Sequence, residues 1–213
     1  MARNADRSAR RYPRPIAAVA AVVVALILGW GCCVAALAEA AVSAERMRKL
    51  AAGEIIVDVV ADPGSNAGLV HAILEIEAPP SAVWVLMLDC GRTMKFNERL
   101  KSCRVTSSDP QGRWDIREHI VEWFWPLPKV RSVFRSEYKP FESIRFQKIE
   151  GDLRELSGSW TLAAIRKGKA TRLTYEARVD PGSVVPGILL RSAMETEIRR
   201  VLTGLRREAT GHE

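Results

Sequence analysis

Residues 170–207 read ATRLTYEARVDPGSVVPGILLRSAMETEIRRVLTGLRR, and this stretch predicts how the domain is built. Its first part, Ala170–Asp180, has the composition of a strand, which Pro181-Gly182 ends. The following part, Pro186–Arg207, has apolar residues at spacings of three and four, as an amphipathic helix does. A strand therefore leads into one long helix with a single apolar stripe. The stripe comprises Leu190, Met194, Ile198, Val201 and Leu205.

The chain before this stretch contains further strand-like segments joined by short turns. Short connections predict that consecutive strands pair in antiparallel fashion. Two strands come first, and the Ala78-Pro79-Pro80-Ser81 sequence then stops the sheet and starts a helix. The predicted strands are 54–61, 69–77, 100–108, 112–125, 129–138, 143–150, 156–165 and 170–180, and the predicted helices are 81–89, 92–97 and 186–207.

The order of these elements predicts the fold class. A curved antiparallel sheet has an apolar face that must be covered, and the carboxy-terminal helix is the only predicted element of the domain long enough to cover it. We therefore expect an α+β fold in which the sheet wraps around this helix, with two short helices after the first strands. The curvature of the sheet leaves a pocket between the sheet and the helix.

Four stretches resemble the helix-grip SRPBCC superfamily, in the branch of polyketide cyclases and coenzyme Q-binding START-like proteins. They are AILEIEAPPSAVWVLMLD (72–89), MKFNERLKSCRV (94–105), EGDLRELSGSWTL (150–162) and TRLTYEARVDPGSVVPGILLR (171–191). The resemblance covers roughly residues 54–207 and implies a helix-grip fold with a cavity for an apolar ligand. The chain departs from this family at Thr93-Met94, where relatives often carry Tyr-Pro. The resemblance supplies no catalytic residue, because the superfamily acts on many unrelated ligands.

The amino-terminal end predicts export. Residues 1–38 carry five arginines and one acid, so most of the formal net charge of +7 lies there, and we expect no nucleic-acid partner. The uncharged run 16–38 spans roughly 34 Å as a helix, enough to cross a bilayer. It is either an uncleaved transmembrane anchor or a signal peptide cleaved after Ala38. Both interpretations place the domain outside the cytoplasm, on the inner membrane facing the periplasm or, after cleavage, in the periplasm or secreted.

The predicted organisation follows from these boundaries. It comprises a basic cytoplasmic arm (1–15), the signal peptide or anchor (16–38), a linker (39–53), the START-like domain (54–207) and a short tail (208–213).

The segment KVRSVFRSEY (129–138) carries the polar groups expected of a ligand pocket. Strand alternation places every second residue from Val130 to Tyr138 on the inner face. Serines and a tyrosine among apolar residues are unusual in a packed core, but they suit a pocket that needs a few polar groups. The alternative is that each of these residues packs against the helix. The predicted ligand-binding residues are Trp114, Ile116, Phe134, Tyr138, Phe146, Trp160, Tyr175, Leu190, Met194 and Ile198.

A hairpin connection, EWFWPLPKV (122–130), is unusually rich in aromatic residues. Three interpretations stay open: another element covers it, it forms a rim that gates the pocket, or it inserts into a membrane interface, where tryptophan is favoured. The residues concerned are Trp123, Phe124, Trp125 and Leu127.

The sequence offers no convincing catalytic or metal site. Strand alternation predicts that His119 is exposed on a polar face, and neither a Ser-His-Asp nor a Cys-His set can be assembled. The cysteines of the domain, Cys90 and Cys103, either form a disulfide or are two buried thiols. Because no metal-site spacing is found, we predict no metal, no cofactor and no catalytic residue.

The leading interpretation is a non-enzymatic domain at a membrane that binds a hydrophobic small molecule or lipid, such as a quinone or an isoprenoid-like molecule. One alternative is a polyketide cyclase/aromatase-like enzyme, for which Tyr138, Tyr175 or Glu118 would point into a deep pocket. Another is a ligand-free protein-interaction module, whose cavity would be filled by its own side chains.

Overall fold

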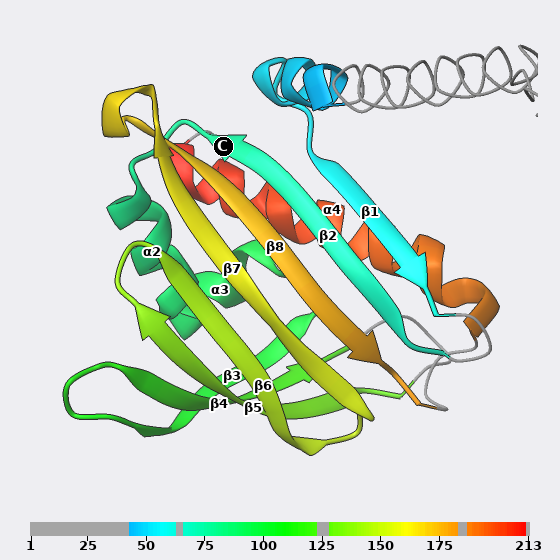
Figure 1. The fold of residues 1–213 in the computed structure, drawn as a ribbon. Helices are drawn as coiled ribbons and strands as arrows, with labels where there is room; N and C mark the ends of the chain where they lie inside the picture. The colour runs from blue at the N-terminus through cyan, green and yellow to red at the C-terminus, as the bar shows by residue number, and fades with distance from the viewer. Residues whose placement is uncertain (1–42, 63–65, 123–127, 183–186, 212–213) are drawn as a thin grey trace, which may run out of the picture. The chain divides into compact units, whose positions relative to one another are not determined.

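An eight-stranded antiparallel sheet forms the framework of the described part of the chain (Figure 1). The structure is a computed structural model that describes residues 43–62, 66–122, 128–182 and 187–211. Two compact units are distinguished, Met1–Met47 and Arg48–Glu213. Only residues 43–47 of the first unit are described, and they are helical. The second unit contains the sheet and the helices discussed below.

The elements follow the predicted order. The strands are β1 (Ile56–Ala61), β2 (Gly68–Ile76), β3 (Leu100–Ser108), β4 (Trp114–Val121), β5 (Val130–Lys139), β6 (Ser143–Gly151), β7 (Glu155–Ile165) and β8 (Ala170–Asp180). The helices are α2 (Pro80–Leu88), α3 (Cys90–Phe96), the short 3-10 helix η1 (Arg166–Gly168) and α4 (Gly187–Thr210).

The sheet runs in the order β1-β2-β8-β7-β6-β5-β4-β3. Strands β3 to β8 therefore form the predicted meander, and the antiparallel α+β fold is confirmed. The hairpin of β1 and β2 joins the meander through β8, with Gly68 opposite Val179 and Ile76 opposite Thr171. This long-range pairing extends the sheet by two strands.

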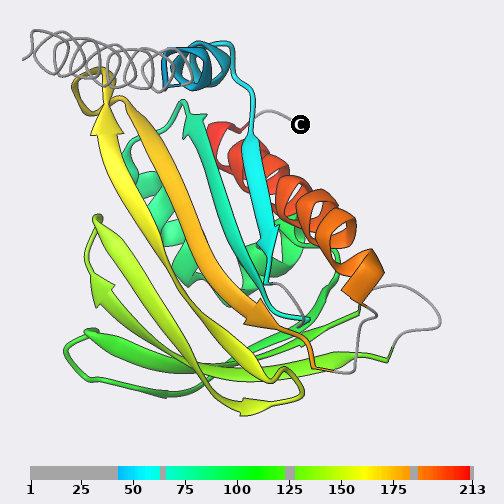
Figure 2. The same cartoon turned by 45° about the vertical axis from the view of Figure 1, so that its right-hand side comes forward.

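Helices α2, α3 and α4 lie on one side of the curved sheet, with β3 to β5 turning toward them (Figure 2). Leu202 and Leu205 of α4 are buried with Leu74 of β2 and Leu173 of β8. Each such side chain contributes about 1.5–3 kcal/mol when it leaves water. The apolar stripe of α4 is thus what holds the helix against the sheet.

The two short helices are separated by Asp89. Pro80 occupies the first turn of α2, where its missing N–H removes no helical hydrogen bond. Asp89 then ends α2, and its carboxylate accepts a hydrogen bond from the Arg92 amide at 3.1 Å, which caps α3. The first residue of α3, Cys90, forms a disulfide with Cys103 of β3, with the Cα atoms 5.3 Å apart. Of the two alternatives for these cysteines, the structure has the disulfide.

Two predicted features lie outside the described residues. One is the 16–38 segment, expected to be an anchor or a signal peptide, and the other is the aromatic connection that holds Trp123, Phe124, Trp125 and Leu127. Within the described ranges, no helix is both long and apolar enough to cross a bilayer.

Candidate ligand-binding site

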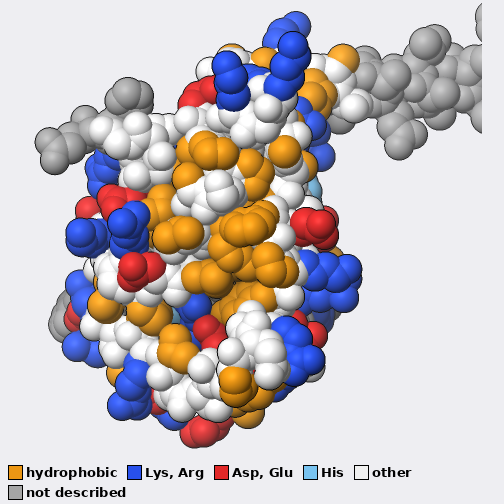
Figure 3. Space-filling model, turned by 90° about the vertical axis from the view of Figure 1, so that its left-hand side faces the viewer, with side chains coloured by type: hydrophobic (Ala, Val, Ile, Leu, Met, Phe, Trp, Pro, Cys, Tyr) orange, Lys and Arg blue, Asp and Glu red, His pale blue; other side chains and the backbone are white. Residues whose placement is uncertain are grey.

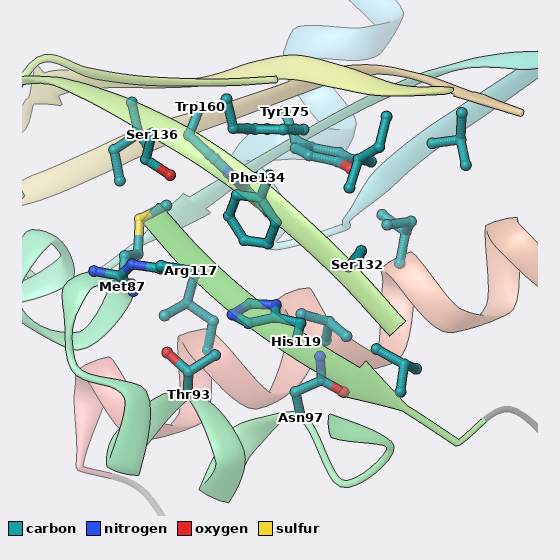
Figure 4. A pocket seen from close by; sticks show the side chains of 18 of the residues that line it. Met87, Thr93, Asn97, Arg117, His119, Ser132, Phe134, Ser136, Trp160 and Tyr175 are labelled. Atoms are coloured by element: carbon teal, nitrogen blue, oxygen red, sulfur yellow. The ribbon is translucent and has the colours of Figure 1, made fainter. Parts of the chain in front are cut away.

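A cavity of about 310 Å³ lies between the inner face of the sheet and the helices α3 and α4 (Figure 4). Most of its wall is apolar, and residues from β4 to β8 contribute to it together with the ends of α2 and α3. Seven of the predicted ligand-binding residues line it, namely Phe134, Tyr138, Phe146, Trp160, Tyr175, Met194 and Ile198.

Strand β5 supplies the central part of the wall. Val130, Ser132, Phe134, Ser136 and Tyr138 all line the cavity, as strand alternation predicts. Ser132 and Ser136 are buried, with 6% and 3% of their surface exposed. The inner face of this strand therefore combines apolar bulk with hydroxyl groups.

Aromatic rings continue the wall across the sheet. The centroids of Phe134 and Phe146 lie 6.2 Å apart, and Phe146 stacks on Tyr175 at 6.1 Å. Trp160 lies 4.2 Å from Tyr175 on the neighbouring strand. These rings from β5 to β8 form a continuous surface suited to an apolar ligand.

Strand β4 faces the opposite way from the sequence-based expectation. Trp114 and Ile116 do not line the cavity, and the Arg135 guanidinium lies over the Trp114 ring at 4.2 Å on the outer face. Arg117 and His119 face inward instead (Figure 4), so the prediction that His119 is exposed is wrong. The inner face of β4 is the polar one because its charged groups find partners there.

Arg117 forms a buried ion pair on this strand. Its Nε donates to Asp115 Oδ2 at 2.8 Å, and both side chains are only 8% exposed. The same guanidinium donates to the carbonyl oxygens of Leu88, at 2.9 Å, and Met87, at 3.4 Å. Arg117 therefore supplies hydrogen bonds to the last carbonyl groups of α2, while its charge is balanced by the Asp115 carboxylate.

His119 is a polar group with a buried, unpartnered atom. Its Nε2 has no hydrogen-bond partner, and its ring meets the Phe134 ring edge-on with the centroids 4.8 Å apart. Burial, followed by the nearby charge of Arg117, lowers the pKa of His119 to about 4. The imidazole is therefore neutral at pH 7. Asn97, at the end of α3, also lines the cavity and has a buried, unpartnered Oδ1.

The tyrosine hydroxyls are also desolvated. Burial raises the pKa of both Tyr138 and Tyr175, so both keep their protons at neutral pH. The Tyr138 hydroxyl is buried without a partner.

Glu118, the third candidate for proton transfer, does not line the cavity. It forms ion pairs with Arg104 at 2.7 Å and with Arg131 at 2.8 Å instead.

An apolar surface leads from the outside to the cavity wall. Hydrophobic side chains gather over α2 and α3 on the face that Figure 3 shows. Val85 of α2 and Phe141 of the β5–β6 turn are about half exposed, at 53% and 50%. The Trp84 ring lies 5.9 Å from both Phe141 and Tyr138. Aromatic contacts thus connect the surface to the cavity.

One predicted ligand-binding residue, Leu190, lies in the first turn of α4, whose side chains are outside the described residues. Within the part of the chain that the structure describes, no cluster of three or more metal-binding side chains occurs. The sequence reasoning missed Thr93, Asn97, Arg117, His119 and Glu197 as lining residues.

Comparisons with known proteins agree with this geometry. The profile of the family described as polyketide cyclase / dehydrase and lipid transport matches residues 76–206. A search of curated proteins finds no match. A solved structure of a Thermus thermophilus protein is 23% identical, with a TM-score of 0.58, and covers 67% of this chain and 97% of its own.

Two further solved structures show the same fold. The STAR-related lipid transfer protein of Xanthomonas axonopodis is 16% identical with a TM-score of 0.63, over 73% of this chain and 93% of its own. The Zhui aromatase/cyclase of Streptomyces sp. R1128 is 14% identical with a TM-score of 0.54, over 68% of this chain and 92% of its own. With a START-like fold and a family profile that matches more than half of its residues, the chain belongs to the polyketide cyclase / dehydrase and lipid transport family.

Proposed function

We propose that the protein binds one hydrophobic molecule in the cavity between the sheet and α4. The observation that carries this proposal is the cavity itself, which is open, about 310 Å³ in volume and walled by aromatic and aliphatic side chains. That volume is at the small end of the range for ligand sites, so it suits a single ring system or a single chain. A quinone, an isoprenoid-like molecule or a single-chain lipid fits this description better than a two-chain phospholipid.

The family description and one relative's name support the same proposal. The family description includes lipid transport, and the Xanthomonas axonopodis relative is named a lipid transfer protein. The open volume also counts against a ligand-free interaction module, which would fill the cavity with its own side chains.

We also propose that the domain works outside the cytoplasm, with residues 16–38 serving as an anchor or a cleaved signal peptide. The disulfide between Cys90 and Cys103 supports this, because disulfides persist in oxidising compartments such as the periplasm.

Ligand binding can be tested by filling the cavity. Ser136 is buried on the inner face of β5, so Ser136→Trp should occupy the cavity, whereas the neighbouring Glu137 is exposed and Glu137→Trp should leave it open. Organic extracts of the purified wild-type protein and of Glu137→Trp should contain a bound hydrophobic molecule by mass spectrometry. The extract of Ser136→Trp should lack it.

The binding proposal fails on either of two results. One is the same ligand recovered from Ser136→Trp, with its fold verified by circular dichroism. The other is wild-type protein that is repeatedly empty and binds no quinone, isoprenoid alcohol or phospholipid on titration.

A second candidate function is a cyclase-like enzyme that folds a reactive chain and moves a proton. The observation favouring it is the buried, unpartnered and protonated Tyr138 hydroxyl on the cavity wall. Tyr138→Phe should then stop conversion of the extracted ligand, followed by mass spectrometry, while leaving its binding intact. Equal conversion by the wild-type protein and Tyr138→Phe would remove this candidate.

A further inference from the structure

The charges on the cavity wall are all balanced within the protein. Of the lining residues that the structure describes, Arg117 and Glu197 carry formal charges. Arg117 is paired with Asp115 at 2.8 Å. The carboxylate of Glu197 on α4 forms ion pairs with Arg99 and Arg200, each at 2.7 Å. Among the described lining residues, the cavity therefore offers no uncompensated cation or anion to a ligand.

This balance disfavours a charged ligand group inside the cavity. A buried carboxylate or phosphate would lose its hydration, and it would need a cation to compensate for that loss. The guanidinium of Arg117 already donates hydrogen bonds to the Asp115 carboxylate and to the carbonyl oxygens of Met87 and Leu88. An anionic head would also lie in the same cavity as the Glu197 carboxylate.

Three polar atoms on the described part of the wall nevertheless have no partner. They are the Tyr138 hydroxyl oxygen on β5, Nε2 of His119 on β4 and Oδ1 of Asn97 at the end of α3, and all three are buried. Figure 4 shows Asn97 on the α3 side of the cavity and His119 on the β4 side. A buried polar atom without a partner is unfavourable, so a ligand that forms the missing hydrogen bonds gains affinity.

The chemistry of the His119 and Asn97 atoms defines the complementary group. An amide oxygen only accepts hydrogen bonds, and a neutral imidazole can donate from one ring nitrogen. A hydroxyl group both donates and accepts, so one hydroxyl can serve both partners. The lowered pKa of His119 keeps the ring neutral and removes any attraction for an anion.

We propose that the ligand is an uncharged hydrophobic alcohol or phenol, whose hydroxyl group donates to Asn97 Oδ1 and accepts from His119 Nε2 while its apolar body lies against the aromatic wall. This inference rests on the proposed binding function and specifies the ligand class for the same cavity.

The first experiment compares matched probes on the wild-type protein at pH 7.5. The probes are 1-decanol, decyl methyl ether and decanoate, with 4-hexylphenol as a ring-bearing hydroxyl compound, each used to displace a fluorescent apolar dye. Decanol should bind about tenfold or more tightly than decanoate, because only the uncharged hydroxyl finds both partners. It should also bind more tightly than the ether, which cannot donate. The comparison of decanol with hexylphenol shows which apolar body the wall prefers.

The second experiment assigns the two hydrogen bonds. Asn97→Leu should remove the advantage of decanol over the ether, because the acceptor for the hydroxyl proton is gone. His119→Phe should weaken the binding of decanol and of the ether by the same factor, because both probes accept a hydrogen bond from the His119 ring. The control is His71→Phe on the outer face of β2, where the ring lies 3.9 Å from Asp58 and away from the cavity. This control should bind all four probes as the wild-type protein does.

The outcomes separate this inference from the proposed function. Decanoate that binds as tightly as decanol, or a decanol advantage that persists in folded Asn97→Leu, overturns the hydroxyl assignment alone. If neither these probes nor any other hydrophobic molecule binds, the proposed function fails as well. The wild-type series decides the ligand class even if a variant does not fold.

Discussion

His119 is the residue whose environment most changes its chemistry. Burial and then the charge of Arg117 lower its pKa from 6.5 to about 4. Between these values the unfolded chain binds a proton that the folded chain does not, so the free energy of unfolding should fall as the pH falls through this window. Between pH 7 and pH 5 we expect this group to account for a loss of about 2 kcal/mol.

Urea denaturation at pH 7 and pH 5 measures that loss. His119→Phe should show a smaller decrease in stability than the wild-type protein. An unchanged pH dependence in His119→Phe would contradict the assignment.

Gly158 on β7 shows how closely the strands approach beneath the aromatic wall. A Cβ atom there would collide with the Glu176 carbonyl oxygen and would lie 2.8 Å from Phe146 Cζ. Gly158→Ala should therefore push β7 away from β8, displace the Phe146 ring and lower the free energy of unfolding by about 1–3 kcal/mol.

The matched control is Ser159→Ala on the same strand, which adds no atoms and should change stability by less than about 0.5 kcal/mol. Urea titrations of the two variants give the comparison. Equal stability of Gly158→Ala and Ser159→Ala would show that the strands can separate at no cost.

At the scale of elements, α3 depends on its surroundings. It has seven residues, too few for a stable isolated helix, yet it carries Thr93 and leads into Asn97 on the cavity wall. Three contacts position it: the Asp89 cap, the disulfide to β3 and the close passage of α4, where a Cβ on Gly204 would collide with the Phe96 carbonyl oxygen. The polar part of the cavity therefore exists only in the assembled fold.

Removing the disulfide tests this dependence. The paired cysteines are separated by 13 residues, so replacing both, as in Cys90→Ser with Cys103→Ser, should lower the free energy of unfolding by about 2–4 kcal/mol. Ligand affinity should fall too, because Asn97 follows α3 directly. Dithiothreitol should reproduce both effects in the wild-type protein and change nothing in the variant. A wild-type protein whose stability is unaffected by dithiothreitol would contradict this role.

At the scale of the whole molecule, the core and the cavity belong to one unit. The buried cluster runs from Ile55 to Leu205, within the Arg48–Glu213 unit. A chain that begins at residue 43 should therefore unfold at the same urea concentration as the full-length protein and should bind the same ligand. A shortened chain that fails to fold would show that the amino-terminal residues contribute to the core.

Export is a separate prediction for the whole chain. In bacterial cells, the protein should appear either in the membrane fraction at full length or in the periplasm with an amino terminus near residue 39. Fractionation followed by amino-terminal sequencing decides between these two forms. Full-length protein with reduced cysteines in the cytoplasmic fraction would refute both.

The sequence by itself determined the order of elements, the antiparallel meander and the inner face of β5. These features follow from local periodicity and short turns, which depend on neighbours in the chain. On β5 the alternation is clear enough to place Phe134 and Tyr138 on the cavity wall. The apolar stripe of α4 likewise predicts that Leu205 is buried, as it is at 2% exposure.

Only the tertiary structure decided the polar chemistry of the site. On β4, alternation places Trp114 and Ile116 inside and His119 outside, and the structure has the reverse. The inward face is set by Arg117, whose hydrogen bonds reach carbonyl groups 29 and 30 residues away at the end of α2. Partners so distant in the chain leave no local pattern, because a charged side chain is buried only where the fold brings its partners to it.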